Sequence, residues 1–162
     1  MGRQQPIELF MPPNMLKAKA GGGLGGMDMA ALKRADQAME TLQGEFAGMI
    51  ADDVKNLVAA RAKFAAAPDA VTRSALLRAA FDIKGNAPTF DFPLIARVAA
   101  SLSRLIGELP DTAPLPAGLV DAHVSAIQVI HRMNIHTTDD KMAQTLCAEL
   151  DAKVGELLAP RK

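Results

Sequence analysis

The sequence is poor in the residues that cross-linking, base stacking and membrane insertion require. Its single cysteine, Cys147, cannot form an internal disulfide bond, and it has six Phe but no Tyr or Trp. Eighteen basic residues balance eighteen acidic ones, which leaves no net charge to hold a nucleic acid. No apolar run approaches the roughly 18 residues that span a membrane. We therefore expect a cytoplasmic protein that binds neither nucleic acid nor membrane.

Motifs that carry catalysis or bind metals are also missing. There is no Walker loop and no Gly-x-Ser-x-Gly, His-Glu-x-x-His or Cys-x-x-Cys pattern. No two of His123, His131 and His136 are three or four residues apart, so they cannot lie side by side on a helix as metal ligands. We expect no enzymatic activity, metal or cofactor, with His131 at the core or its boundary, His136 near a helix C-terminus and Cys147 as a small buried hydrophobe.

Residues 1–27 differ in composition from the rest of the chain. They contain Pro6, Pro12, Pro13 and the run GGGLGG, which favour neither a helix nor an independent core. We interpret them as a flexible arm. Its segment IELFMPPNML, residues 7–16, is more apolar than a linker requires. Two alternatives stay open for this segment: it is disordered or packs on the protein, or it is a recognition motif for a partner.

Residues 28–162 are expected to form a single all-α domain. Alanine is abundant, and the alternating β-branched or aromatic runs of β-strands are missing. After Asp28 as N-cap, apolar residues recur every three or four positions, in one long bent helix or in two pieces, as far as Pro68-Asp69. Asp53 interrupts this stripe. The members of the apolar stripe are Leu32, Ala35, Met39, Leu42, Phe46, Met49, Leu57, Ala60 and Phe64.

Four further helices are predicted after Pro68. The third helix of the chain should begin with Asp91 as N-cap and Pro93 in its first turn, and the fourth, Ala117 to His136, should be the most buried. A capping box at Thr137 should start the last helix. Short loops favour antiparallel neighbours, so we predict an antiparallel four-helix bundle with an N-terminal helical extension. The predicted inner residues are Leu76, Ala80, Ile83, Ala87, Ile95, Val98, Leu102, Leu105, Leu109, Leu119, Val120, Ala122, Val124, Ala126, Ile127, Ile130, Met133, Ala143, Leu146, Leu150, Val154 and Leu157.

The stretch LLRAAFDIKGNAP, residues 76–88, allows two interpretations. Lys84, Gly85 and Pro88 are typical of a helix end, and the stretch is then only a helix stop. Alternatively it is a docking face, because Phe81 falls outside the inner stripe of its helix. That stripe is complete without Phe81, so we expect its side chain to be exposed, and the alternative is that it has turned into the core.

The pattern FDIKGNA resembles the motif of histidine-containing phosphotransfer (HPt) domains of bacterial phosphorelays, His-x-Leu-Lys-Gly-Ser/Ala-Ala. The resemblance runs from about Phe46 to the C-terminus, and residues 52–90 are similar to the family's first two core helices and their turn. Lys84 and Gly85 match the motif, but Phe81 takes the place of the histidine. A phenyl ring has no nucleophilic nitrogen, so it cannot carry a phosphoryl group. Pro88 stands where the family continues this helix, so we expect the helix to end early.

The resemblance implies a non-catalytic pseudo-HPt signalling protein that binds a receiver domain or a histidine kinase. Two alternatives stay open. In the first, phosphotransfer survives through His123, His131 or His136. In the second, the chain is a structural protein that forms homo-oligomers through its long N-terminal helix. The residues expected at the partner contact are Phe81, Lys84, Gly85, Arg78, Asp82 and Leu77.

Overall fold

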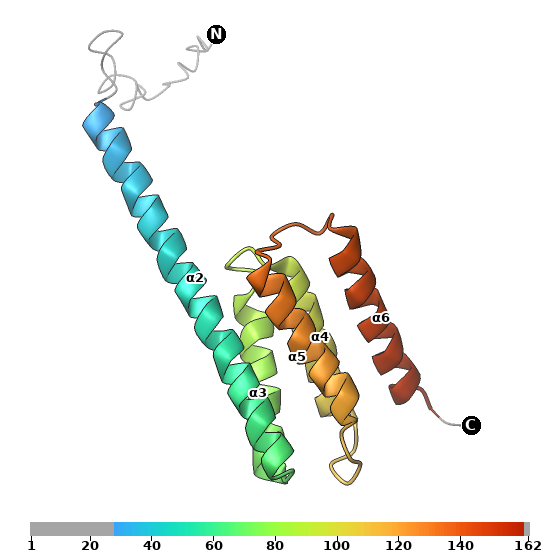
Figure 1. Ribbon diagram of the computed structural model, residues 1–162. Coiled ribbons are helices and arrows are strands. Elements are labelled where there is room, and N and C mark those ends of the chain that lie inside the picture. Colours follow the sequence, from blue (N-terminus) through green and yellow to red (C-terminus); the bar gives the residue numbers. More distant parts are fainter. Residues whose placement is uncertain (1–27, 161–162) are drawn as a thin grey trace, which may run out of the picture. The chain divides into compact units, whose positions relative to one another are not determined.

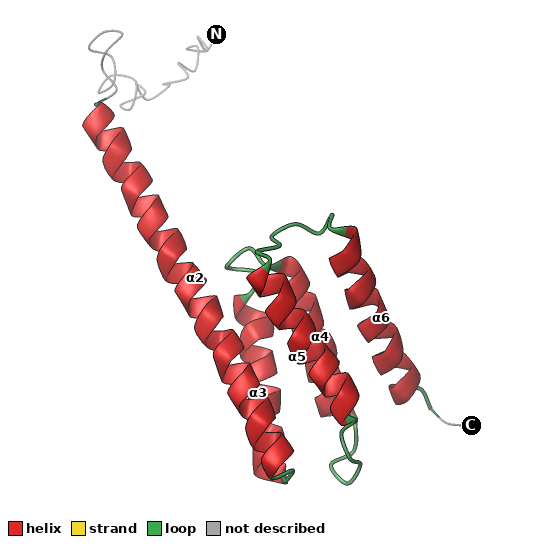
Figure 2. Cartoon of the chain, in the orientation of Figure 1, coloured by secondary structure: helices red, strands yellow, loops and turns green. Residues whose placement is uncertain are grey.

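The computed structural model describes residues 28–160, and all the regular structure in this range is helical. The predicted arm and its segment 7–16 lie outside the described residues. The all-α class is confirmed, and no helix in the described range is long and apolar enough to cross a membrane. The five described helices are α2 (Met29–Ala66), α3 (Ala70–Asn86), α4 (Pro93–Glu108), α5 (Ala117–Arg132) and α6 (Lys141–Leu158) (Figures 1 and 2).

Helix α2 is one uninterrupted helix of 38 residues, which decides between the two forms left open by the sequence. The chain divides into two compact units within it, one ending at Gln43 and one starting at Gly44. Every described residue of the first unit is exposed. In the second unit α2 contributes Ile50, Val54 and Leu57 to the core.

The first half of the predicted α2 stripe is exposed, with Leu32, Met39 and Leu42 at 41%, 57% and 44%. Met49 was expected on the inner face, but its side chain is 56% exposed, and Ile50 is fully buried instead. The core-facing residues of α2 are Ile50, Val54 and Leu57, which are spaced by four and three residues.

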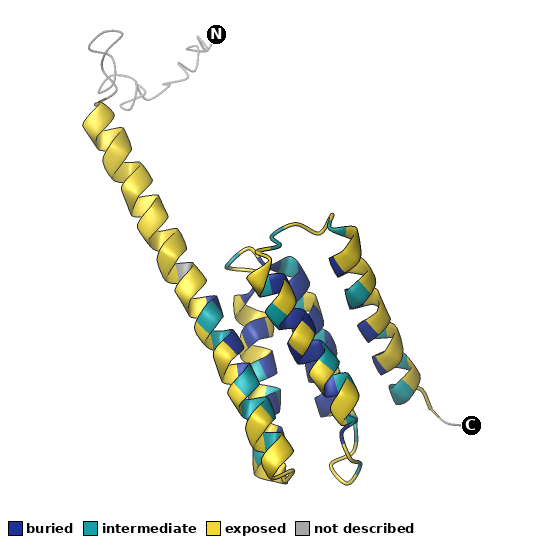
Figure 3. Cartoon of the chain, in the orientation of Figure 1, coloured by how far each residue is buried: buried dark blue, intermediate teal, exposed yellow. Residues whose placement is uncertain are grey.

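The core of the second unit is centred on α4. This helix contacts α3, α5 and α6, and the buried residues lie along these facing surfaces (Figure 3). Helix α4 has nine buried residues and α5 has six, so the prediction that α5 is the most buried helix is wrong. A helix packed on three others leaves little of its surface to solvent. Met133, which was predicted to be an inner residue, is 59% exposed, because it lies just past the end of α5. The predicted inner residues that are buried are Leu76, Ala80, Ile83, Ala87, Ile95, Val98, Leu102, Leu105, Val120, Val124, Ala126, Ile127, Ile130, Ala143, Leu150 and Val154, together with Cys147.

The start of α4 differs from its prediction by one residue. Asp91 was predicted as the N-cap, but it adopts a left-handed φ of 66°, and Phe92 is the N-cap residue instead. Pro93 occupies the first turn, as predicted. Asp tolerates the left-handed conformation better than most residues, and here it reverses the chain between α3 and α4.

The junction between α5 and α6 also differs from its prediction. Helix α5 ends at Arg132 and not at His136, because Asn134 adopts a left-handed φ of 55° that no helix continues. Helix α6 is capped by Asp140 and not by Thr137. The Asp140 carboxylate accepts a 2.9 Å hydrogen bond from the backbone N–H of Ala143.

Candidate functional site

Both ends of α3, the helix that carries the HPt-like motif, are fixed by local interactions. At its start, Asp69 Oδ1 accepts a 2.8 Å hydrogen bond from the Thr72 N–H, and the Asp69 N–H donates to Thr72 Oγ1 at 3.1 Å. This capping box lowers the pKa of the Asp69 carboxyl, chiefly through the bond from the Thr72 backbone. At its other end α3 stops at Asn86, two residues before Pro88. The expected early end of this helix is confirmed.

A side-chain hydrogen bond joins the end of α3 to α2. Asn86 Nδ2 donates to Asp53 Oδ2 at 2.9 Å. Asp53 is the polar residue that interrupts the apolar stripe of α2, and this bond explains its place there. The sequence alone did not indicate the pair, because its two members are 33 positions apart.

Phe81 lies on the outward side of α3. Successive residues of an α-helix are about 100° apart, so the inner stripe of α3 places position 81 roughly opposite the core. Leu76, Ala80 and Ile83 are fully buried, whereas the Phe81 side chain is 50% exposed. The predicted exposure of Phe81 is confirmed. Lys84 Nζ lies 5.4 Å from the centroid of the Phe81 ring, within the range of a cation–π contact.

Gly85 leaves an open surface next to Phe81. A Cβ atom added there would meet no atom within 4 Å, so the packing of this chain does not require glycine. Glycine inside a helix costs about 1 kcal/mol relative to alanine. The glycines of the other described helices are equally open, so this openness by itself does not distinguish Gly85.

Five of the six predicted contact residues are exposed on α3, and Leu77 is not. Phe81, Lys84 and Gly85 share an exposed strip of α3. Arg78 and Asp82 are also exposed, but they line a small hollow of about 190 Å³ with residues of α2, among them Asp53, Asn56 and Ala60. Leu77 is half-buried and lines a different pocket on the other flank of α3. We use the term docking strip for Phe81, Lys84 and Gly85, the three predicted contact residues that line neither pocket.

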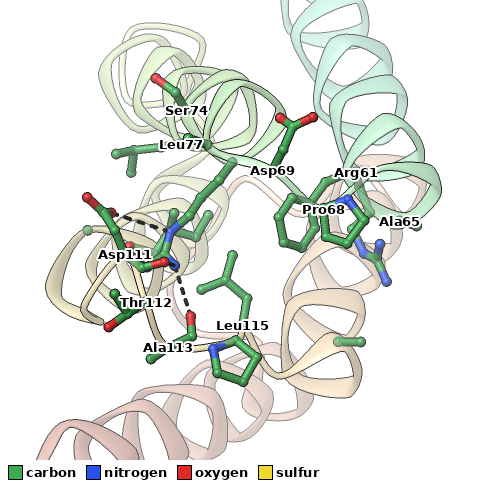
Figure 4. Close-up of a pocket in the computed structure, with 17 residues that line it drawn as sticks. Arg61, Ala65, Pro68, Asp69, Ser74, Leu77, Asp111, Thr112, Ala113 and Leu115 are labelled. Carbon is green, nitrogen blue, oxygen red and sulfur yellow. Dashed lines mark hydrogen bonds and ion pairs between the residues drawn. The ribbon is translucent and has the colours of Figure 1, made fainter.

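The larger pocket lies between the first turns of α3, the end of α2 and the loop that joins α4 to α5 (Figure 4). Its volume is about 890 Å³. Pro68 and Ala65 line one side, and Thr112 and Ala113 line the other. Apolar side chains such as Leu115 make up much of its wall.

Arg73 lines this pocket, and sequence analysis missed it. Arg73 is only 9% exposed. The one available signal was its position three residues before Leu76, which continues the inner stripe of α3 with a charged residue. Its guanidinium Nη1 and Nη2 donate to five carbonyl oxygens at 2.8–3.5 Å, those of Ile106, Leu109, Pro110, Asp111 and Ala113. Because these donors are occupied by the protein, Arg73 fastens the loop and is not placed to bind a ligand.

His123 is part of the core. It is fully buried, and its Nδ1 lies 2.7 Å from the carbonyl oxygen of Leu119, which can only accept, so Nδ1 carries the hydrogen. The Ser101 hydroxyl then donates to Nε2 at 3.0 Å. Burial lowers the pKa of His123, partly opposed by the bond to Leu119 and by the charge of Asp151. A buried imidazole with both nitrogens occupied is poorly placed to accept a phosphoryl group from another protein.

The rings of His131 and His136 both lie near the buried Phe92 ring, with centroid distances of 5.8 and 4.2 Å. His131 is half-buried, as predicted for a boundary residue, and burial lowers its pKa. His136 donates from Nδ1 to the carbonyl oxygen of Asp91 at 2.7 Å and bonds the Asn134 side chain through Nε2 at 2.9 Å. These bonds hold Asp91 and Asn134, the two residues with a left-handed φ, and they occupy both ring nitrogens of His136.

No metal-binding cluster of three His, Cys, Asp or Glu side chains occurs among residues 28–160. Burial raises the pKa of the Cys147 thiol, which keeps it in the unreactive neutral form. Comparison of the chain with protein-family models, with curated proteins and with solved structures gives no match. Its function therefore has to be inferred from its own residues.

Proposed function

We propose that this chain is a pseudo-HPt protein, which binds a receiver domain or a histidine kinase of a two-component pathway without transferring a phosphoryl group. In this proposal residues 44–66 of α2 and helices α3, α4 and α5 correspond to the antiparallel four-helix bundle of HPt domains. Helix α3 is the second of these helices, the one that carries the phosphorylated histidine in the family. The docking strip is Phe81, Lys84 and Gly85.

The observation that carries the proposal is the exposure of Phe81 at the position of the histidine. Phe81 is 50% exposed, and aromatic side chains are enriched among the anchors of protein interfaces. Lys84 adds a positive charge that can face the aspartate of a receiver domain. The open surface at Gly85 lets a partner approach the helix closely.

Binding to receiver domains tests the docking strip. We would measure the affinity of the full chain for receiver domains and histidine kinases from its own organism, and repeat the measurement with Phe81→Ala. Truncating a hot-spot residue typically costs about 2 kcal/mol or more, so Phe81→Ala should weaken binding by about 30-fold. Val71→Ala is the matched control, because Val71 is an exposed apolar residue of the same helix, 78% exposed, outside the strip. Equal affinities for the two variants in a pair that binds would remove Phe81 from the interface.

A gain of phosphotransfer tests the correspondence to HPt domains. The variant Phe81→His places an imidazole on an exposed position beside Lys84 and Gly85, so it should accept a phosphoryl group from a phosphorylated receiver that binds the chain. The bond from the receiver aspartate to phosphorus breaks, and a bond from the imidazole nitrogen to phosphorus forms. Acid-labile phosphate on Phe81→His but not on the wild type is expected. Phosphate on the wild-type chain would show that another histidine is active and would contradict the proposal.

A further inference from the structure

The first unit of the structure, residues 28–43, presents an apolar helical face to solvent. All its residues are exposed, and Leu32, Met39 and Leu42 are 41%, 57% and 44% exposed. Most helical stability in proteins comes from packing of the apolar face. This segment of α2 is therefore expected to have a packing partner.

The spacing of the apolar face suits packing against another helix. Leu32, Ala35, Met39 and Leu42 are separated by three, four and three residues, which are the a and d positions of a heptad repeat. The sequence continues this spacing at Phe46 and Met49. Ile95, Val98, Leu102 and Leu105 of α4 have the same spacing and pack against other helices, so the pattern indicates a helical partner.

Two polar residues on the opposite side of this helix segment, Arg34 and Thr41, interact with their own chain. Arg34 Nε donates to the carbonyl oxygen of Ala30 at 3.2 Å, and its Nη2 lies 3.6 Å from Asp28 Oδ2. Thr41 Oγ1 donates to the carbonyl oxygen of Gln37 at 2.8 Å. The apolar face is thus left clear of charged side chains. The residues at b, c and f positions are Lys33, Arg34, Gln37, Glu40 and Thr41.

The positions that flank the face fit a second copy of the same helix. These e and g positions are Ala31, Asp36, Ala38 and Gln43. In a parallel, in-register pair, Ala31 of one copy faces Asp36 of the other, and Ala38 faces Gln43. No like charges meet, and the single acidic residue offers no pattern that would select a differently charged helix. We propose that residues 29–43 pair with a second copy of the chain as a two-stranded coiled coil.

Sedimentation of the full chain over a wide range of concentrations tests this pairing. The wild type should be a dimer that dissociates on dilution. Met39→Glu places a charge in the seam and should weaken dimerisation by about tenfold or more. Gln37→Glu adds the same residue on the opposite side of the same turn and should leave the dimer intact. Leu42→Glu is a second seam variant, so the result does not depend on the folding of one substitution.

Two results would overturn the coiled coil. The first is a wild-type chain that stays monomeric at the highest concentration reached, and the second is a dimer that Met39→Glu and Leu42→Glu weaken no more than Gln37→Glu does. Far-ultraviolet circular dichroism provides an independent readout, because dissociation of the coiled coil should reduce helicity while the cooperative unfolding of the second unit is retained. The outcome is independent of receiver binding, since the residues involved are not those of the docking strip.

Discussion

The Lys84 ammonium lies over the phenyl ring of Phe81, with 5.4 Å between Nζ and the ring centroid. An exposed cation–π contact of this kind contributes about 0.5–1 kcal/mol. It orders the two longest side chains of the docking strip on the surface of α3. The strip therefore combines an apolar ring and a positive charge that a partner can contact at the same place.

The exposure of Phe81 predicts a small effect on stability when it is truncated. Phe81→Ala should lower the free energy of unfolding by about 1 kcal/mol or less, because little packing is lost. Ile83→Ala, two residues later, should lower it by about 2–5 kcal/mol, because Ile83 is fully buried and the change leaves a cavity. Urea unfolding of the two variants measures both values. A loss for Phe81→Ala as large as that for Ile83→Ala would mean that Phe81 belongs to the core.

The hydrogen bonds of the buried Arg73 guanidinium predict that replacing Arg73 destabilises the protein, because they hold the loop between α4 and α5. Arg73→Ala removes the donors to five carbonyl oxygens and should destabilise the protein by about 2–4 kcal/mol. Arg104→Ala is the control, because Arg104 is exposed and pairs only with Glu108 one turn later at 3.2 Å. Thermal unfolding distinguishes them. Similar melting temperatures for both variants would show that solvent replaces the Arg73 bonds.

The lowered pKa values of His123 and His131 predict a loss of stability in mild acid. Because burial depresses both pKa values in the folded state, the unfolded chain takes up these protons first as the pH falls. Their contribution is fully present above the unfolded pKa of about 6.5 and declines below it. The wild type should therefore unfold at lower urea concentration at about pH 5.5 than at about pH 7.5, a window in which most carboxylates do not titrate.

Substitution of His123 tests the origin of this dependence. His123→Gln should reduce the difference in unfolding free energy between the two pH values, and His123→Gln with His131→Gln should remove most of it. An unchanged difference in the double variant would assign the dependence to other groups.

Local spacing was sufficient to predict the two faces of α3. Leu76, Ala80, Ile83 and Ala87 recur with the period of a helix. When these residues are buried, Phe81 is exposed, regardless of which helices pack against α3. The same reasoning gave the all-α class and the end of α3 before Pro88. These features depend on backbone geometry and on residues close together in the sequence.

The tertiary structure decided what depends on distant partners. Asp53 meets Asn86, and Arg73 meets the loop after α4, across separations of more than 30 residues. The left-handed turn at Asp91, braced by His136 from beyond α5, moved the start of α4. Periodicity within one helix cannot show which residues of another helix or loop will satisfy a buried or capping group, because only packing brings them together.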